Sequence, residues 1–189
     1  MSTAAKNRTI VYSINGAKKG QVYTGAIDLR AGGKVTAWYK ENPALKVEMT
    51  YPKIESVPLE VAFASSEEPG SGSATRMVDG DPSSIWHTMY SNTLAKYPHW
   101  VDFDAGETKN MKGFTLLPRQ EGANGWIKDY EIYVSQDGKE WGEPIVKGTF
   151  ARNAELKRVM FDKPVQAGFI RLRALNRHDG QDYASAAEF

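Results

Sequence analysis

Short apolar runs separated by turn-forming residues are the feature that most constrains how this chain folds. The runs are rich in β-branched and aromatic residues and recur roughly every ten residues. The clearest runs are Ile10–Ile14, Lys34–Tyr39, Lys46–Tyr51, Trp100–Asp104, Gly113–Leu117, Tyr130–Ser135, Lys157–Phe161 and Phe169–Ala174. No segment keeps a helical period over ten residues. The sequence therefore predicts an all-β sandwich, with helix limited to short turns such as 77–78 and 83–84.

A proline-containing segment between two strand-like regions predicts a linker at residues 53–58. The stretch Tyr51-Pro-Lys-Ile-Glu-Ser-Val-Pro58 carries two prolines, which cannot donate to a sheet, and two charged residues. We expect a small β module at 1–52 and a larger domain at 59–189. The small module has few strands for an independent core, so it is either truncated or supported by its neighbour.

Composition excludes several classes of protein. The chain has 189 residues, 41% of them hydrophobic, which is enough for a buried core. Its 24 Lys and Arg residues against 23 Asp and Glu residues give a net charge of +1, so no long-range field attracts nucleic acid or an anionic membrane. No apolar run approaches the ~18 residues of a membrane span, and the first residues have no apolar signal-peptide core. We expect no membrane insertion, and we expect any export signal to lie outside this chain.

Cysteine is absent, which removes disulfides, zinc–thiolate sites and thiol nucleophiles. The sequence also lacks Gly-x-Ser-x-Gly, His-Glu-x-x-His and Gly-x-x-x-x-Gly-Lys motifs. A glycosidase needs two carboxylates held ~5–9.5 Å apart in a cleft. Glu67 and Glu68 are adjacent, and no motif identifies a partner for either. We therefore predict that this chain is not an enzyme.

Several blocks of the larger region resemble one known family when they are taken together and in order. The blocks are Ala74-Thr-Arg-Met-Val-Asp-Gly-Asp-Pro-Ser-Ser-Ile-Trp-His-Thr88, Trp100-Val-Asp-Phe-Asp104, Leu117-Pro-Arg-Gln120, Ile127-Lys-Asp-Tyr-Glu-Ile-Tyr-Val-Ser-Gln-Asp-Gly138 and Phe169-Ile-Arg-Leu-Arg173. From Val57 to Phe189 the chain resembles the factor 5/8 type C, or discoidin, domain, and within it bacterial family 32 carbohydrate-binding modules. The resemblance implies a discoidin-type jelly-roll β-sandwich.

A second resemblance covers the N-terminal region. Its blocks are Ile10-Val-Tyr-Ser-Ile-Asn-Gly16, Gln21-Val-Tyr-Thr-Gly25, Ala26-Ile-Asp-Leu29 and Gly33-Lys-Val-Thr-Ala37. They resemble part of the small Ig-like module that follows the catalytic domain of chitobiases and β-hexosaminidases. The chain departs from that family's Asp-Gly-Ser/Thr-x-Pro-Thr at Asn15-Gly-Ala-Lys. A generic sandwich fragment remains the alternative.

Carboxylates, a hydroxyl and a tight turn converge between residues 76 and 84, and Ca²⁺ takes ~6–8 oxygen ligands of these kinds. The resemblance implies a structural Ca²⁺ that joins the two ends of the domain. Its implied ligands are the carbonyls of Arg76, Asp81 and Ala187 with the side chains of Asp79, Ser84 and Glu188. The Asp-Gly-Asp-Pro sequence also suits a plain turn, in which aspartates accept from nearby backbone amides.

A sugar site needs an aromatic face for the pyranose C–H groups and polar side chains for its hydroxyls. The resemblance implies that His87, Arg119 and Asn124 reach the hydroxyls while Tyr183 stacks on the ring. Tyr90 and Glu68 are implied as secondary contacts. Each residue also has a plain structural interpretation, such as a hydrogen-bonded histidine at the core edge or an asparagine in a turn. We assign Trp86, Trp100 and Trp141 to the core, whereas Trp126 could widen the sugar platform.

The sequence thus predicts non-catalytic binding of terminal galactose or N-acetylgalactosamine-type sugars. The chain would be an ancillary C-terminal region of a bacterial glycoside hydrolase such as a β-hexosaminidase, and its partners would be glycan termini and a catalytic domain. The location would be extracellular, cell-surface or periplasmic. One alternative is a discoidin module that binds protein or phospholipid through Met89 and Leu94. The other is a purely structural accessory domain.

Overall fold

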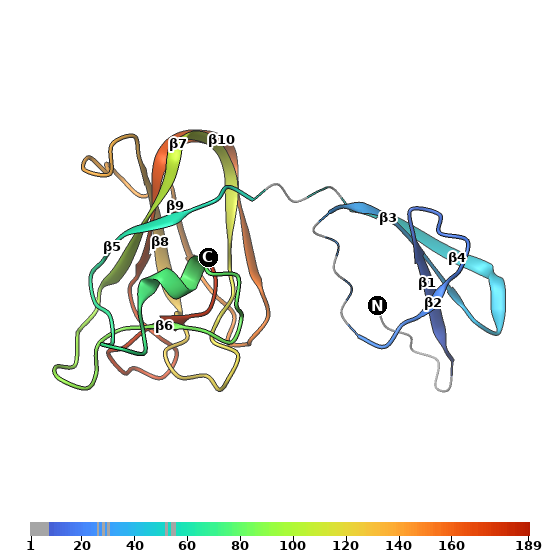
Figure 1. Cartoon of the computed structure of the whole chain (residues 1–189), viewed down its shortest axis with the longest axis horizontal. Helices are drawn as coiled ribbons and strands as arrows, with labels where there is room; N and C mark the ends of the chain where they lie inside the picture. The colour runs from blue at the N-terminus through green and yellow to red at the C-terminus, as the bar shows by residue number, and fades with distance from the viewer. Residues whose placement is uncertain (1–7, 26, 28, 30, 52, 54–55) are drawn as a thin grey trace. The chain divides into compact units, whose positions relative to one another are not determined.

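The computed structural model describes residues 8–25, 27, 29, 31–51, 53 and 56–189. The chain divides into two compact units, Met1–Ser56 and Val57–Phe189 (Figure 1). The division falls inside the segment predicted as a linker, of which residues 54 and 55 lie outside the described residues. Within the described part of the chain, no helix is long and apolar enough to cross a bilayer.

The smaller unit is one antiparallel sheet with the strand order β2-β1-β3-β4. Its strands are β1 (Ile10–Ile14), β2 (Gln21–Val22), β3 (Gly33–Tyr39) and β4 (Asn42–Tyr51). Val11 is buried and faces Trp38 across the β1–β3 ladder. A Cβ added to Gly20 would lie 2.6 Å from both of these side chains. The segment before β2 therefore packs closely over this face of the sheet, and only glycine fits there.

In the described residues of the larger unit, seven strands form two sheets, and one short 3₁₀ helix lies outside them. These elements are β5 (Glu60–Ala64), the 3₁₀ helix η1 (Ala74–Val78), β6 (Trp86–His87), β7 (His99–Leu116), β8 (Asp129–Ser135), β9 (Val146–Thr149), β10 (Lys157–Ala174) and β11 (Ser185–Ala186). One sheet has the order β5-β7-β10-β8-β9, and the second pairs β11 with β6. Apart from η1 the described chain is β structure and loops, so the predicted all-β sandwich class is confirmed.

Two of the predicted strand boundaries were wrong. The runs 100–104 and 113–117 belong to one strand, β7, apart from residue 117, and the runs 157–161 and 169–174 belong to β10. The β7–β10 register shifts between Met160 and Val165 and again between Ala167 and Phe169. The intervening polar residues look like turns in the sequence, but the strands accommodate them as irregularities of the ladder. The predicted runs also did not include β5, β9 and the two-residue strands β2, β6 and β11.

The core of the larger unit lies between the long strands and the segments that carry η1 and β6. Its largest fully buried side chains include Trp86, Phe103 and Met77. The prediction that Trp100 and Trp141 also belong to the core was wrong. Both rings are only partly buried and lie 5.6 and 4.1 Å from the guanidinium carbon of Arg171, because this cation on β10 gives them a stacking partner at the sheet surface.

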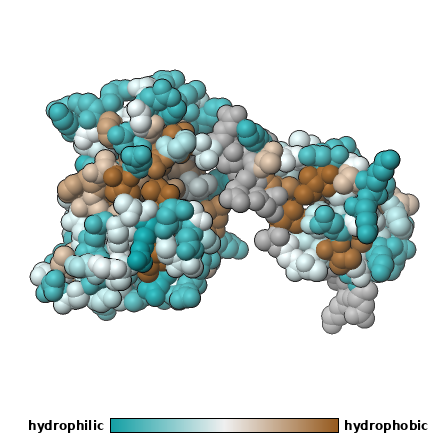
Figure 2. Space-filling view, in the orientation of Figure 1, coloured by the Kyte–Doolittle hydropathy of each residue, from teal (hydrophilic) through white to brown (hydrophobic). Residues whose placement is uncertain are grey.

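The connecting loops that follow β6, β7 and β10 gather at one end of the larger unit, below the label of β6 in Figure 1. The unit's surface is mostly polar in the view of Figure 2, with small apolar patches between the hydrophilic side chains. The sandwich therefore brings loops that are distant in sequence to one place.

Candidate functional site

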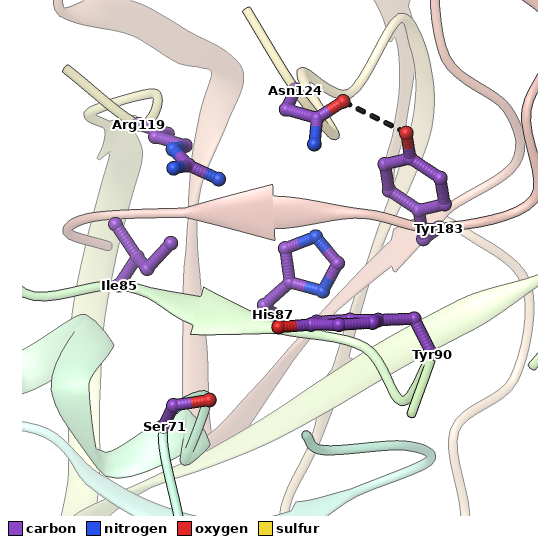
Figure 3. A pocket seen from close by; sticks show the side chains of 7 residues that line it. All are labelled: Ser71, Ile85, His87, Tyr90, Arg119, Asn124 and Tyr183. Carbon is purple, nitrogen blue, oxygen red and sulfur yellow. Dashed lines mark hydrogen bonds between the residues drawn. The ribbon is translucent and has the colours of Figure 1, made fainter. Parts of the chain in front are cut away.

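The loop end of the larger unit contains a pocket of about 490 Å³. It is lined by Ser71, Ile85, His87, Tyr90, Arg119, Asn124 and Tyr183 (Figure 3). The lining comes from four segments of the chain that are far apart in sequence. Five of the six side chains assigned to sugar contacts lie here together, and Glu68 is the one that does not line the pocket.

Backbone hydrogen bonds join the segment of His87 to the segment of Tyr183. His87 pairs with Ser185 in the β6–β11 ladder. Beyond the ladder, Thr88 N donates to Ala184 O at 3.0 Å, and Ala184 N donates to the Thr88 hydroxyl at 3.0 Å. These buried bonds fix the distance between the two loops that carry the aromatic and imidazole rings of the pocket.

The loop of Asn124 is attached to the same last segment. Ser185 N donates to Gly125 O at 2.8 Å, and Ser185 Oγ donates to Asn124 O at 2.6 Å. Gly125 has a φ of +81°, and a Cβ there would lie 2.6 Å from Ser185 Oγ. Glycine is therefore required at this position, both for its conformation and for the close approach of the two segments.

His87 is 6% exposed, and its Nδ1 lies 2.6 Å from the carbonyl oxygen of Thr88. A carbonyl only accepts, so Nδ1 carries the proton and the neutral ring keeps a lone pair on Nε2. Burial lowers the pKa of His87 below its ordinary value, and the nearby positive charge of Arg119 lowers it further, although the Thr88 bond opposes this. At neutral pH the imidazole thus offers a hydrogen-bond acceptor.

Asn124 and Tyr183 form a polar pair opposite His87 (Figure 3). The Tyr183 hydroxyl donates to Asn124 Oδ1 at 2.8 Å, and Arg177 Nη2 lies 3.4 Å from the same oxygen. Because Arg177 can only donate, the atom that faces it must be the amide oxygen. The Asn124 NH₂ group is then left as a donor for the pocket.

Arg177 was not predicted as part of the site. It is 5% exposed, pairs with Asp179, and places its guanidinium carbon 4.2 Å from the centre of the Tyr183 ring. Its Nη1 is buried and has no hydrogen-bond partner among the described residues. Arg177 therefore supports Asn124 and Tyr183 from behind. Ser71 and Ile85, which line the pocket, were also missed, because small and aliphatic residues in a loop carry no sequence signal of their own.

Arg119 supplies the positive charge of the pocket. Its Nε donates to Glu121 O at 2.8 Å, and its own carbonyl accepts from Trp126 Nε1 at 2.8 Å. In the part of the chain that the structure describes, its guanidinium makes no ion pair with Asp129 or any other carboxylate. The terminal nitrogens remain as donors, and Trp126 holds the backbone of Arg119 instead of extending an aromatic platform.

Three rings meet in the pocket. His87 stacks on Tyr183 with 5.2 Å between ring centres and 28° between planes, and it meets Tyr90 edge to face at 5.0 Å and 79°. Tyr90 is 55% exposed, whereas Tyr183 is only partly exposed and also contacts Arg177. Tyr90 therefore presents more open ring surface to a ligand than Tyr183 does.

Glu68 lies behind the loop of Tyr90. Its side chain is buried and accepts hydrogen bonds from Tyr90 N at 2.7 Å and Ser91 N at 3.1 Å. Hydrogen bonds from the Ser91 side chain and the Tyr90 amide lower the pKa of Glu68, so the carboxylate is ionised. Its position makes it a support for the Tyr90 loop.

Four of the six implied Ca²⁺ ligands surround the turn after η1. Ser84 Oγ donates to Asp79 Oδ2 at 2.8 Å and lies 3.3 Å from the Arg76 carbonyl. The Asp81 carbonyl accepts from Ser84 N at 3.1 Å. The Asp79 and Asp81 side chains also accept from backbone amides, as in a plain turn. The turn therefore places carboxylate, hydroxyl and carbonyl oxygens close together.

The other two implied ligands, Ala187 and Glu188, directly follow β11. Leu117 N donates to the Glu188 carbonyl at 2.8 Å, and Ala187 N donates to the Leu117 carbonyl at 2.8 Å. Glu188 Oε1 is buried without a hydrogen-bond partner among the described residues, and burial followed by the charge of Asp79 raises the pKa of Glu188. No group of three or more His, Cys, Asp or Glu side chains suited to a metal occurs in the described ranges. A buried carboxylate oxygen beside Asp79 that lacks a donor nevertheless fits a hard cation.

Comparison with known proteins places most of this chain in a family. Residues 62–189 match the family model of the F5/8 type C domain. A sialidase from Micromonospora viridifaciens is 35% identical over 150 residues, which are 78% of this chain and 23% of the sialidase. A galactose oxidase from Gibberella zeae is 38% identical over 116 residues, which are 60% of this chain and 17% of the oxidase. The chain thus spans less than a quarter of the length of these relatives.

Solved structures of other proteins are similar to the larger unit, among them the following three. The module CpGH89CBM32-5 from Clostridium perfringens, in complex with GalNAc-β-1,3-galactose, has 33% sequence identity and a TM-score of 0.65, and the match covers 71% of this chain and 96% of that module. The family 32 module of NanJ from C. perfringens, in complex with galactose, has 31% sequence identity and a TM-score of 0.62. The match covers 70% of this chain and 93% of that module. A chitobiase C-terminal domain from Bacteroides fragilis, at 22% identity and a TM-score of 0.62, shares the fold over 69% of this chain and 90% of that domain.

Proposed function

The chain belongs to the F5/8 type C domain family, and on that premise we propose that its larger unit binds a terminal sugar of the galactose or N-acetylgalactosamine type without catalysis. The observation that carries the proposal is the shared pocket of His87, Arg119, Asn124, Tyr183 and Tyr90. Two structural relatives above 30% identity are complexes with galactose-containing ligands.

The polar groups of the pocket suit a sugar hydroxyl. A hydroxyl donates one proton and accepts through its lone pairs. His87 Nε2 can accept that proton, while the Asn124 NH₂ group and the Arg119 guanidinium donate to the oxygen. A sugar hydroxyl that contacts His87, Asn124 and Arg119 at once gives each of these side chains a hydrogen-bond partner. A hydroxyl in the wrong configuration leaves polar groups unpaired once the sugar covers them, which costs ~1–3 kcal/mol. We propose that the axial 4-hydroxyl of galacto-configured sugars takes this place.

The exposed ring of Tyr90, with the edge of Tyr183, provides the apolar contact for the C–H face of the sugar. The pocket has room for a terminal sugar, and few atoms of a longer glycan would be buried, so binding is expected to be weak for one site. Attached to an enzyme, such a module would raise the local concentration of glycan near the active site. The proposed partner is the catalytic domain of a bacterial glycoside hydrolase, such as a β-hexosaminidase, that acts outside the cytoplasm.

We also propose a structural Ca²⁺ held by the carbonyls of Arg76, Asp81 and Ala187 and the side chains of Asp79, Ser84 and Glu188. Bound there, the ion would supply the positive charge that the buried Glu188 oxygen lacks. The chain's own backbone also joins this region to the C-terminal residue, because Phe189 N donates to the Met77 carbonyl at 2.8 Å.

A glycan array that includes liposomes tests the proposed function. We expect signals on glycans with terminal galactose or N-acetylgalactosamine, and we expect Arg119→Ala to weaken them by roughly 10–100-fold, since a hydrogen bond from a charged group contributes ~1.5–3 kcal/mol. Arg158→Ala is a matched control, because this exposed arginine of β10 does not line the pocket. Signals on liposomes or on a protein ligand alone would favour the discoidin-type adhesion alternative. Equal binding by both variants would mean that the pocket is not the site.

A further inference from the structure

Strand β4 is the edge of the sheet in the smaller unit, and all ten of its residues are exposed. Among the described strands its ladder partner is β3 alone. The second side of an edge strand presents a row of backbone N–H and C=O groups that another strand can pair with. Proteins usually shorten, charge or cover such edges. β4 carries the charged residues Lys46 and Glu48, but it is ten residues long.

The register shows which backbone groups of β4 face outward. Lys34 N donates to Asn15 Oδ1 at 2.8 Å, and Asn15 N donates to Lys34 O at 2.8 Å, so the backbone of Lys34 faces away from β4. Backbone groups alternate along a strand. Val35 therefore faces β4, where it pairs with Met49. The even-numbered residues 46–50 of β4 then direct their N–H and C=O groups to the free edge.

Alternate side chains of β4 form an exposed apolar row. Leu45, Val47, Met49 and Tyr51 are 59%, 70%, 57% and 38% exposed. Alternate residues share one face of a strand, so these four lie side by side. Apolar side chains also reach the surface of the smaller unit in the view of Figure 2. A contiguous exposed apolar row on a free edge is typical of an interaction surface.

We propose that β4 is a self-association surface through which two copies of this chain pair as antiparallel strands, with Val47 facing Val47 across a two-fold axis. This register joins the outward backbone groups of residue 46 in one copy to those of residue 48 in the other. It places Lys46 opposite Glu48 twice, and it places Leu45 opposite Met49 on the apolar face.

Charge selects this register over its neighbours. Shifting the two-fold axis by one residue keeps the outward backbone groups paired but puts Lys46 opposite Lys46, or Glu48 opposite Glu48. Like charges directly opposite each other destabilise an antiparallel pair, and opposite charges stabilise it. Glu48 is already oriented on this face by Lys34 at 2.6 Å and by the Thr36 hydroxyl at 3.1 Å. A second copy thus meets a complementary pattern of charge that an unrelated strand would match only by chance.

The dimer would carry two copies of the pocket. If the proposed function holds, two sites on one particle would bind a surface that displays many sugars more tightly than a monomer does. The self-association itself does not depend on sugar binding, so it is tested without sugar.

Sedimentation velocity of the full chain over a range of protein concentrations tests the inference. We expect the mass to rise from 21.0 kDa toward twice that value as concentration increases. Lys46→Glu and Glu48→Lys should each weaken dimerisation by about 10-fold or more, because each places like charges opposite each other twice. The double variant K46E/E48K should restore the dimer, because opposite charges face each other again. Lys18→Glu, which makes the same charge change in an exposed loop, should have no effect.

A mass of 21.0 kDa at every concentration would overturn the inference. Two results would overturn the proposed register. One is unchanged dimerisation in both Lys46→Glu and Glu48→Lys, and the other is a double variant that does not recover the dimer. Val47→Lys gives a second test, since it sets two lysines against each other at the axis while changing a side chain that is 70% exposed in the monomer. Thermal melting of each variant at low concentration checks that the fold is intact. Sugar binding that fails in a chain that still dimerises would count against the proposed function only.

Discussion

Tyr183 donates its hydroxyl proton to Asn124 Oδ1 at 2.8 Å, and this bond determines which end of the Asn124 amide faces the pocket. Arg177 contacts the same oxygen from behind at 3.4 Å. With the oxygen occupied by two donors, the NH₂ group is directed to the ligand. The acceptor on His87 and the donor on Asn124 then lie on different sides of the pocket, as Figure 3 shows, and a sugar hydroxyl can bridge them.

Tyr183→Phe removes the hydroxyl and keeps the ring. We expect sugar affinity to fall by about 3–10-fold, because a net hydrogen bond contributes ~0.5–1.5 kcal/mol and the amide loses a donor that orients it. Isothermal titration measures the change. Tyr133→Phe is the matched control, since the Tyr133 hydroxyl bonds Glu131 at 2.7 Å on the sheet and does not line the pocket. Unchanged affinity in Tyr183→Phe would show that the amide orientation does not depend on this bond.

Arg177→Met should weaken sugar binding and lower the melting temperature together. The variant keeps the apolar stem but removes the guanidinium that contacts Asn124 and the Tyr183 ring, and it leaves Asp179 without its ion pair. We expect a loss of about 1–3 kcal/mol of stability. Arg177→Lys should lose less affinity and less stability than Arg177→Met, because lysine keeps the positive charge although it lacks the planar guanidinium group. Full affinity in Arg177→Met, with a lower melting temperature, would limit Arg177 to a purely structural role.

Sugar affinity should depend on pH through His87. Burial holds the pKa of His87 below its ordinary value near 6.5, so the ring is neutral at pH 7 and accepts at Nε2. Affinity should be constant from pH 8 to about 6.5 and should fall as the pH drops further, because protonation converts the acceptor into a donor. Titrations at a series of pH values measure this. An affinity that increases on acidification would contradict the assigned tautomer.

The same histidine links stability to pH. Its native pKa, like that of the buried His99, lies below the unfolded value. At pH values between the native and the unfolded pKa, the unfolded chain therefore binds more protons than the native chain. The contribution of the two histidines to stability is complete above about pH 6.5, and it is lost as the pH falls through the native pKa. Melting curves in the absence of sugar should show this decrease. A melting temperature that rises between pH 6.5 and 5 would contradict it for these two groups.

Calcium should raise the melting temperature, and Glu188→Gln should abolish this effect. A ligand at 100-fold its dissociation constant adds about 2.7 kcal/mol, or roughly 5–10 °C for a unit of this size. Burial and the charge of Asp79 raise the native pKa of Glu188, so without metal its contribution to stability falls as the pH rises through that pKa. The increase caused by calcium should accordingly be larger at pH 7.5 than at pH 4.5.

Scanning fluorimetry with and without a chelator measures the calcium effect. In the chelator, Glu188→Gln should melt at or above the temperature of the unchanged protein, because it removes the charge of a partly buried carboxylate whose Oε1 has no hydrogen-bond donor among the described residues. Glu121→Gln is the control, since Glu121 lies on an exposed loop outside the proposed metal site. An equal calcium effect in Glu188→Gln and in the control would exclude the proposed site.

The sequence contains enough information to predict the class of fold but not the length of its strands. The runs around Trp100 and Phe169 show alternation and β-branched composition, which local pattern detects. Gly106 and residues 162–164 look like turns. They have no partners in the β7–β10 register, and only the pairing on either side of them keeps them within the two strands. That pairing is a long-range property, so no local pattern shows it.

The pocket residues could be predicted only through the resemblance to the family. His87 and Arg119 fall within blocks that resemble the family, Asn124 lies between two of them, and the structure places all three in one pocket. Arg177 lies in the polar stretch Asn176-Arg-His-Asp179, which resembles an exposed loop in sequence. Its burial depends on the loop of Asn124 folding over it, a contact between segments 53 residues apart. Such burial cannot be deduced from the residue or its neighbours.

The central claim is that the pocket distinguishes galacto-configured sugars by one hydroxyl. Isothermal titration of the full chain against galactose, N-acetylgalactosamine and N-acetylglucosamine tests it most directly. We expect the first two to bind at least about 10-fold more tightly than the third, since a misplaced hydroxyl leaves His87 or Asn124 unpaired at a cost of ~1–3 kcal/mol. Equal affinity for all three sugars, or no heat with any of them, would contradict the account.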